Sequence, residues 1–354
     1  MRETLPARQK NDTIMKSLIF TVIFFLSYLT VLGQNGIKNG NLFLLKQDQK
    51  TISINSFENN EIKQIKTFVI SEKSIYTTDQ KERVAILDTA KNSISLIDIK
   101  TESKSELKIP FDLKPKAILL NDENLFIGGE MGKEMLVQYN IQSQEWYKLQ
   151  IPIEVMFPGK AIDDLVVNDS SLIAIDNIIM PKYVLFYKLN SKGKLDLSHF
   201  KELKSNGAYE SIYQGRITDN YFGLISGTYS GYVGATEHIT VYDNLNLKNS
   251  FALSSNEQKK DYHTFTDFVI IGDKIAIASK EKGFGLFQIK NSYFKESDEY
   301  RNSGFNSTVN TSKIKYEEIK NETITKITIV PNTSKIVLTI ENKKGKIRHE
   351  IREI

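Results

Sequence analysis

The stretch Leu119-Leu120-Asn121-Asp122, followed by Leu125-Phe126-Ile127, decides the fold of this chain because its pattern recurs. Each copy has an apolar pair, a short turn rich in Asp, Asn or Gly, and a second apolar run. Further copies lie at Val166–Ala174, Ile270–Ile277 and, more loosely, Ile329–Leu338. Repetition of one small antiparallel unit indicates a ring or a linear array of similar sheets.

Apolar and polar residues alternate with a period of two through most of the chain after Gly40, which predicts strands and no long amphipathic helix. The unit that begins near residue 115 is expected to hold four strands, at residues 117–120, 124–128, 134–141 and 146–151. Units begin near residues 73, 115, 161, 210, 264 and 323. Residues 41–70 and 323–354 supply three strands each.

We therefore predict an all-β fold, a β-propeller of four-stranded antiparallel blades. The number of units favours seven blades, with six as the alternative. An incomplete sheet at each end is what ring closure through shared strands would leave. A large β-sandwich or a solenoid is the competing architecture. Residues 34–354 are expected to form one propeller domain.

The N-terminal segment predicts export. Lys16 precedes an apolar run, Leu18–Leu32, which Gly33 and Gln34 follow. This order is typical of a secretory leader, and the run is short for a membrane span of about 20 residues. We predict that residues 1–33 are an N-terminal extension plus a signal peptide, with Met15 as an alternative start. The protein is then periplasmic or secreted, whereas an uncleaved leader would anchor it to a membrane.

The composition excludes several classes of function. The chain has 47 basic and 43 acidic residues, a net charge of +4 and no cysteine. Without cysteine there is no disulfide, thiolate metal site or cysteine nucleophile. Near-balanced charge without a basic stripe argues against nucleic acid as a partner. The four histidines lack metal-ligand spacing, and no nucleophile elbow or phosphate-binding loop is present, so we predict no catalytic residue and no metal ligand.

Charged residues recur near the start of each predicted innermost strand, where a propeller opens its central channel at one rim. The residues at roughly equivalent places are Lys116, Asp164, Arg216, Asp267 and Lys326. Such a ring could bind a polar ligand or a cation, with Ca²⁺ as a candidate cofactor. The alternative is a set of ion pairs and waters that fills the axial hole. Asp163 should point away from Asp164 unless a bulge intervenes.

Two loops are unusual. Tyr229 and Tyr232 lie among Gly and Ser residues in the stretch Gly227–Glu237, which favours a recognition loop on the same rim. A long hairpin whose tyrosines pack on a neighbouring blade is the alternative. The polar stretch Asn291–Ser312 predicts a mobile insert on the opposite rim.

The chain resembles bacterial exported β-propellers, namely the six-bladed TolB-like and seven-bladed YVTN groups. The similar residues are the turns Asn168-Asp169 and Gly272-Asp273 and the strand ends Val241-Tyr242-Asp243 and Leu96-Ile97-Asp98. The regular Trp-Asp ends of other propeller repeats and the metal ligands of propeller lactonases are missing, so no catalytic residue carries over. The resemblance implies a binding or assembly module of the cell envelope.

These observations predict a non-catalytic binding or scaffold module for a protein, peptide or glycan ligand on the loop-bearing rim. The alternative is a hydrolase or lyase that uses carboxylates at the channel mouth with a divalent cation. In that case Asp164 and Asp267 would be the ligands and Arg216 would hold an anionic substrate.

Overall fold

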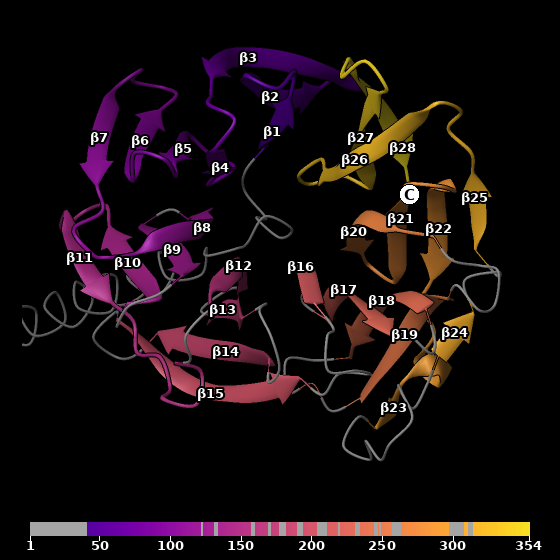
Figure 1. The fold of residues 1–354 in the computed structure, drawn as a ribbon. Helices are drawn as coiled ribbons and strands as arrows, with labels where there is room; N and C mark the ends of the chain where they lie inside the picture. The colour runs from indigo at the N-terminus through magenta and orange to yellow at the C-terminus, as the bar shows by residue number, and fades with distance from the viewer. Residues whose placement is uncertain are drawn as a thin grey trace, which may run out of the picture.

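Seven antiparallel sheets surround a central opening (Figure 1). The structure, a computed structural model, describes residues 41–354 without 122, 131–133, 157–159, 169–170, 177–181, 190–193, 204–210, 219, 231–233, 244–246, 248, 257–262, 297–307 and 311–313. The predicted leader lies outside the described residues. The seven-bladed propeller is confirmed, and the sheets begin within two residues of the predicted unit starts.

The first three blades follow one another along the chain. Blade 1 comprises β1 (Leu42–Lys46), β2 (Thr51–Glu58) and β3 (Glu61–Val69). Blade 2 comprises β4 (Ser74–Thr78), β5 (Arg83–Asp88), β6 (Ser93–Asp98) and β7 (Lys104–Lys108). Blade 3 comprises β8 (Lys114–Leu120), β9 (Asn124–Glu130), β10 (Leu136–Asn140) and β11 (Glu145–Lys148).

The remaining blades complete the ring. Blade 4 comprises β12 (Ile162–Asn168), β13 (Ser171–Asp176), β14 (Lys182–Leu189) and β15 (Leu195–Leu203). Blade 5 comprises β16 (Ser211–Ile217), β17 (Phe222–Ser230), β18 (Gly234–Tyr242) and β19 (Asn249–Asn256), with β23 (Lys295–Glu296) and β24 (Thr308–Asn310) added outside β19. Blade 6 comprises β20 (Phe265–Ile271), β21 (Lys274–Ser279), β22 (Gly283–Gln288) and β25 (Lys315–Glu317), and blade 7 comprises β26 (Glu322–Ile329), β27 (Lys335–Asn342) and β28 (Ile347–Glu353).

The repeated turn has a local cause. Asn121 accepts hydrogen bonds at its Oδ1 from the backbone N–H groups of Glu123 (3.1 Å) and Asn124 (2.8 Å), which reverses the chain between β8 and β9. The equivalent turn before β21 uses Gly272, whose φ of +54° lies in the left-handed region that glycine tolerates. In these blades a short polar side chain or a glycine therefore forms the turn that leads into the second strand.

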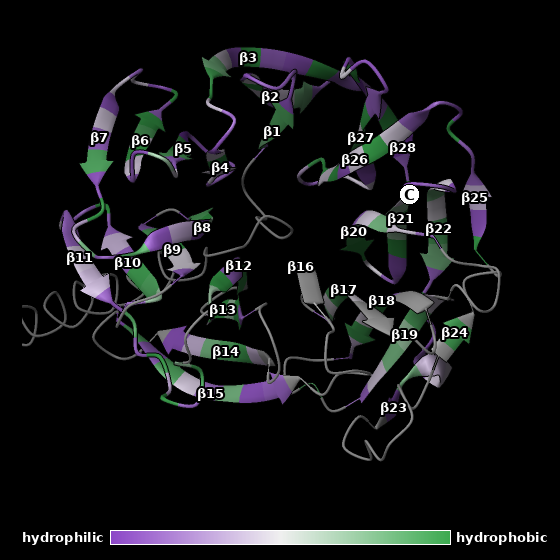
Figure 2. Ribbon diagram, viewed as in Figure 1, coloured by the Kyte–Doolittle hydropathy of each residue, from purple (hydrophilic) through white to green (hydrophobic). Residues whose placement is uncertain are grey.

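Apolar side chains pack between the blades. Seven clusters of buried residues are found among the described residues, one for each pair of neighbouring blades. The middle strands contact a blade on both faces, which is why five consecutive residues of β13, from Leu172 to Asp176, are buried. The outer strands β7 and β11 have no buried residue and are more hydrophilic (Figure 2). Burial on both faces explains the long apolar runs in the sequence.

The inner strands form a closed circle. β1, β4, β8, β12, β16, β20 and β26 line the opening, and each contacts the inner strand of the next blade, with β26 returning to β1. The predicted closure through shared strands is wrong for the described residues, because blades 1 and 7 are separate three-stranded sheets. Side chains close the seam instead, where Phe43 and Leu45 of β1 pack against Val330 and Val337.

The predicted mobile insert after β22 is partly ordered. A 3-10 turn, η2 (Asn291–Tyr293), leads into β23, which pairs with β19 of the preceding blade, and β24 adds a parallel pairing there. Phe294 contacts Phe251 with ring centroids 5.0 Å apart. The described ends of the insert therefore fasten blade 6 to blade 5. No helix among the described residues is long and apolar enough to span a membrane.

Candidate functional site

A one-residue β-bulge recurs in the inner strands of blades 3 to 7. In each, one residue is skipped in the register with the neighbouring strand. The skipped residues are Lys116, Asp163, Tyr213, Thr266 and Thr325. A bulge breaks the alternation of side chains between the two faces of a strand, so two consecutive residues can point to one side. In blades 4 to 7 the bulge falls on a pair of polar residues, whereas in blade 3 it falls on Lys116 between Pro115 and Ala117.

The residue after the bulge in blade 4, Asp164, links two blades. Its Oδ1 accepts a hydrogen bond from the N–H of Leu165 (2.9 Å), and its Oδ2 accepts one from the N–H of Gly215 (2.5 Å) on the inner strand of blade 5. Burial raises the pKa of Asp164, an effect that the nearby Arg216 opposes. Both carboxylate oxygens are therefore occupied by backbone donors.

Asp267 occupies the same place in blade 6. Its Oδ1 accepts from the N–H of Phe268 and its Oδ2 from the N–H of Ile327 on blade 7, both at 2.8 Å. Arg216 adds a buried ion pair at 2.7 Å, with side chains 8% and 1% exposed. The Arg216 guanidinium also donates to the carbonyls of Phe268 (3.0 Å) and Gly215 (2.8 Å). We call Arg216 and Asp267 the inter-blade latch.

Lys116 forms a different pair on the opposite side of the opening. Its Nζ lies 2.7 Å from Oε1 of Glu130, and the two side chains are 43% and 27% exposed. This hydrogen bond raises the pKa of Lys116 and lowers that of Glu130. The bulge residue Asp163 lies nearby, and its Oδ2 is enclosed without a hydrogen-bond partner among the described residues. Burial raises the pKa of Asp163 to about 6.

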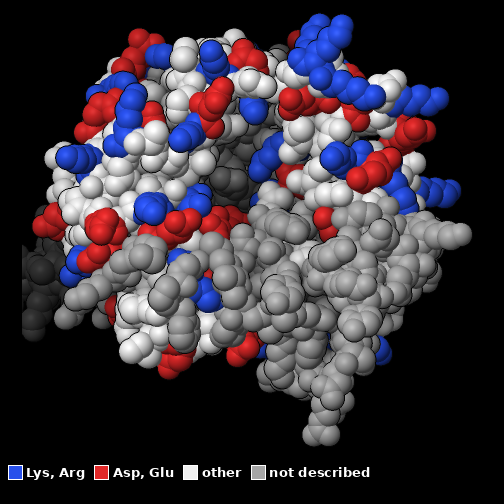
Figure 3. Space-filling view, viewed as in Figure 1, with Lys and Arg blue, Asp and Glu red and all other residues white. Residues whose placement is uncertain are grey.

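Two cavities occupy the opening. The larger has a volume of about 510 Å³ and is lined by Lys326, Thr325 and Thr339 of blade 7 together with residues of blades 1 and 2. The smaller has about 160 Å³ and is lined by Lys116, Asp163 and Asp164 among others. Both are bordered by Ile75, Tyr76 and Arg216, so they lie side by side. Figure 3 shows the hollow with charged side chains of both signs around it.

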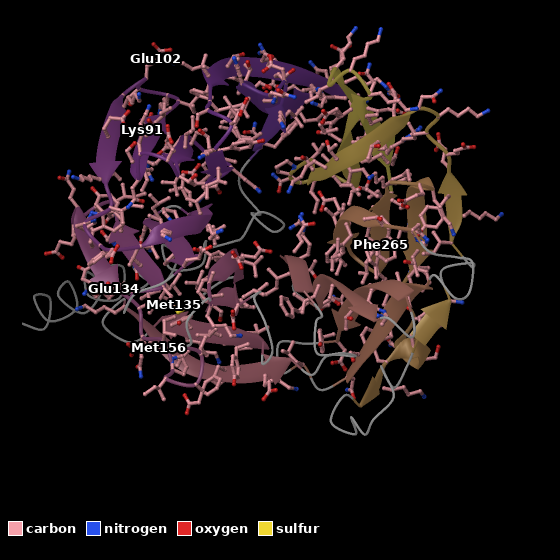
Figure 4. All side chains as sticks on the ribbon, viewed as in Figure 1. Lys91, Glu102, Glu134, Met135, Met156 and Phe265 are labelled. Atoms are coloured by element: carbon pink, nitrogen blue, oxygen red, sulfur yellow. The ribbon has the colours of Figure 1, made fainter. Side chains whose placement is uncertain are left out.

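Lys326, in the wall of the larger cavity, is only loosely paired. Its Nζ lies 3.8 Å from Oδ2 of Asp267, and its side chain is 48% exposed although the walls of the channel surround it. Desolvation by these walls lowers the pKa of Lys326, and the nearby Arg216 adds to the effect while Asp267 opposes it. Figure 4 shows side chains of several inner strands pointing into the opening, whereas Lys91 and Glu102 of blade 2 lie away from it.

The predicted charged residues do meet at the opening, but they are not equivalent. Asp164, Asp267 and Lys326 each follow a bulge, whereas Lys116 is itself a bulge residue and Arg216 lies three residues after Tyr213. The latch and Asp164 form a structural network of the kind that the sequence analysis gave as the alternative to a ligand site. Lys116 and Lys326 retain access to the cavities.

The tyrosine loop is largely a hairpin. β17 continues to Ser230 and β18 begins at Gly234, so most of the predicted loop is strand. Tyr229 lies on β17, in register with Ala235, and its side chain is outside what the structure describes. Tyr232 lies outside the described residues. The predicted recognition role of both tyrosines stays a prediction.

Sequence reasoning missed Asp163. Alternation predicted that it points away from Asp164, yet the bulge brings both carboxylates to the smaller cavity. A signal was present, because a polar doublet stands between apolar residues at Ile162–Leu165, Phe265–Phe268 and Ile324–Ile327. A doublet that breaks the period of two at the same place in three units indicates a repeated bulge.

The charged groups do not assemble an evident metal site. Within the described parts of the chain, no group of three or more His, Asp or Glu side chains is placed to hold a metal ion. Asp164 and Asp267, the predicted Ca²⁺ ligands, lie in blades 4 and 6 and bind different backbone donors.

Comparison with one solved β-propeller supports the fold. No family model and no curated protein matches the chain. The β-propeller domain of Myceliophteria thermophila Cps50 (Swd1) is similar, with a TM-score of 0.56 and 8% identity over 92% of this chain and 97% of that chain. Hsv2 of Kluyvelomyces marxianus has a TM-score of 0.49 and 13% identity over 89% and 94% of the two chains. The β-propeller domain of the trilobed protease of Pyrococcus furiosus has a TM-score of 0.49 and 12% identity, over 88% of this chain and 95% of that chain.

Proposed function

We propose that this protein is a non-catalytic binding module and that its ligand, a segment of a peptide or protein, enters the central opening. The observation that carries the proposal is Lys326, whose Nζ has no hydrogen-bond partner within 3.5 Å among the described residues and faces a cavity of about 510 Å³. Thr325, Thr328 and Thr339 contribute to the cavity wall. A compact ammonium among hydroxyl groups suits a carboxylate of the ligand.

A rigid frame supports this role. Because the latch and the Asp164 hydrogen bonds fix neighbouring inner strands, the groups around the cavity are held before a ligand arrives. A preformed site loses less conformational entropy on binding. The proposal therefore gives the latch a positioning role and assigns the direct contacts to Lys326 and the hydroxyl groups.

Replacement of Lys326 by methionine is expected to weaken binding of an acidic peptide about tenfold or more, because a hydrogen bond to a charged group contributes about 1.5–3 kcal/mol. A peptide array and a glycan array would first identify ligands, and calorimetry would measure the affinities of both proteins. Lys335→Met is the matched control in the same blade, since Lys335 Nζ bonds Asn60 outside the cavity. Equal losses in both variants, or ligands found only among glycans, would contradict the proposal.

Catalysis at the channel mouth is the second candidate, because the bulge brings Asp163 and Asp164 to one cavity. A hydrolase or lyase of this kind would turn over lactones, esters or glycosides and would be stabilised by Ca²⁺. Millimolar Ca²⁺ should then raise the melting temperature of the protein, and Asp163→Asn should abolish that increase. If the protein turned over none of these substrates and Ca²⁺ did not raise its melting temperature, the result would favour the non-catalytic binding module.

We further propose that the protein is exported and acts in the periplasm or outside the cell. The support is the apolar run Leu18–Leu32 behind Lys16. Mass spectrometry of the N-terminus of the native protein tests this, with cleavage expected before Gln34. An intact N-terminus would favour a membrane anchor.

A further inference from the structure

The smaller cavity contains a carboxyl group whose charge is not balanced by a direct contact. Asp163 lines this cavity of about 160 Å³, and its Oδ2 has no hydrogen-bond partner within the described part of the chain. Removing a carboxylate oxygen from water without giving it a donor is unfavourable. A carboxyl group without a donor beside an open volume is therefore a place where a ligand can supply one.

Every charged group around Asp163 is already engaged. Lys116 of β8 pairs with Glu130 at the end of β9 at 2.7 Å, and Arg216 of β16 pairs with Asp267 at 2.7 Å. Asp164, on the same strand, accepts two backbone N–H groups. The remaining neighbours from β4, Ile75 and Tyr76, bring no charge. When Asp163 and Asp164 are both ionised, this end of the opening therefore carries two negative charges without a direct cationic partner among the described residues.

We propose that the smaller cavity binds a primary ammonium group and that Asp163 accepts its hydrogen bond. The proposal rests on the proposed function in one respect: a lysine side chain or an N-terminus of the bound peptide would supply the group. Because Oδ2 is enclosed, at most one oxygen of this carboxyl group is open to a ligand, and this suits a compact ammonium better than a guanidinium, which binds two oxygens side by side. Ca²⁺ would require six to eight oxygen ligands, whereas Asp163 and Asp164 are the carboxylates among the described residues that line this cavity.

Binding of the ammonium group should depend on pH. In the free protein the Asp163 carboxyl has a pKa of about 6, and Lys116 lowers this pKa while Glu130 and Asp164 raise it. An ammonium ion binds the ionised carboxylate, so its binding is complete well above pH 6 and fades as the pH falls through that value. Between pH 7.5 and pH 5 the affinity should fall about tenfold, as the ionised fraction does.

The test uses n-butylammonium chloride as the probe and carbon-13 NMR of the aspartate carboxyl groups as the readout. We expect one signal to titrate near pH 6, to be missing in Asp163→Asn, and to move to lower pH when the probe is added. Sodium chloride at the same ionic strength and n-butanol are the controls, because general screening and apolar contact should leave the titration in place.

Lys116→Met serves as the second variant. Its Asp163 signal should titrate at higher pH, because a nearby positive charge is lost, and n-butylammonium should still lower that value. Titration of Asp163 near pH 4 in the unmodified protein, or a pKa that the probe does not lower, would overturn the proposal. Since no peptide is used, this result is independent of the peptide affinities that test the proposed function.

Discussion

Replacement of Arg216 by methionine is expected to lower the free energy of unfolding by about 3–5 kcal/mol, the cost of leaving a buried charge without its partner. Asp267 is 1% exposed and would keep two backbone donors but lose the guanidinium at 2.7 Å. The carbonyls of Phe268 and Gly215 would also lose a donor. Urea unfolding followed by tryptophan fluorescence and circular dichroism would measure the difference.

Arg348→Met is the matched control for this prediction. Arg348 pairs with Glu322 at 2.6 Å on the outside of blade 7, where its side chain is 45% exposed. An exposed pair contributes about 1 kcal/mol or less. If both arginine variants lost equally little stability, the latch would not hold the inner strands together.

A double variant separates the charge from the packing. Arg216→Met combined with Asp267→Leu removes both charges and fills a similar volume, so it should regain a large part of the lost stability. It cannot restore the hydrogen bond from Ile327 to Asp267, which joins blades 6 and 7. A double variant as unstable as the single one would show that this backbone hydrogen bond, rather than the unpaired charge, dominates.

The arrangement of the sheets could be predicted because the chain repeats its local chemistry. Apolar runs such as Leu172–Ile175 and turn residues such as Asn121 and Gly272 act over a few positions, and the same pattern in successive units requires successive sheets. Blade number and unit starts follow from spacing alone. The way in which the two chain ends close the ring could not be predicted from spacing, because closure depends on contacts between residues almost 300 positions apart.

The site was predictable only in outline. The sequence placed charged residues at the opening. It could not show that Arg216 of blade 5 pairs with Asp267 of the neighbouring blade 6, because residues 51 positions apart in the sequence leave no local pattern. The role of Asp163 depended on a one-residue bulge, which reverses the direction of a side chain without changing the composition of the strand. Local sequence patterns therefore determine which strands form, whereas the pairing of charged residues depends on how the blades are arranged around the opening.

Replacement of Phe43 by alanine is expected to open the ring at its seam. Phe43 is 2% exposed, and the seam cluster has fewer buried members than any other cluster in the described part of the protein. Loss of a buried phenylalanine costs about 3–5 kcal/mol. No described strand is shared between blades 1 and 7. Besides this cluster, the seam has hydrogen bonds such as those from Lys335 to Asn60 (2.8 Å) and between His349 and the Lys46 carbonyl (2.9 Å).

Hydrogen exchange would distinguish this opening from a general loss of stability. In Phe43→Ala, amides of β1 and β27 should lose protection at a lower free energy than those of blades 3 to 5, because only the terminal blades lack a chain connection across their interface. Phe251→Ala is the matched control, since Phe251 is also fully buried but lies between blades 5 and 6, which the chain and its insert join. Uniform loss of protection in both variants would mean that the ring unfolds as one unit and that the seam is as strong as the other interfaces.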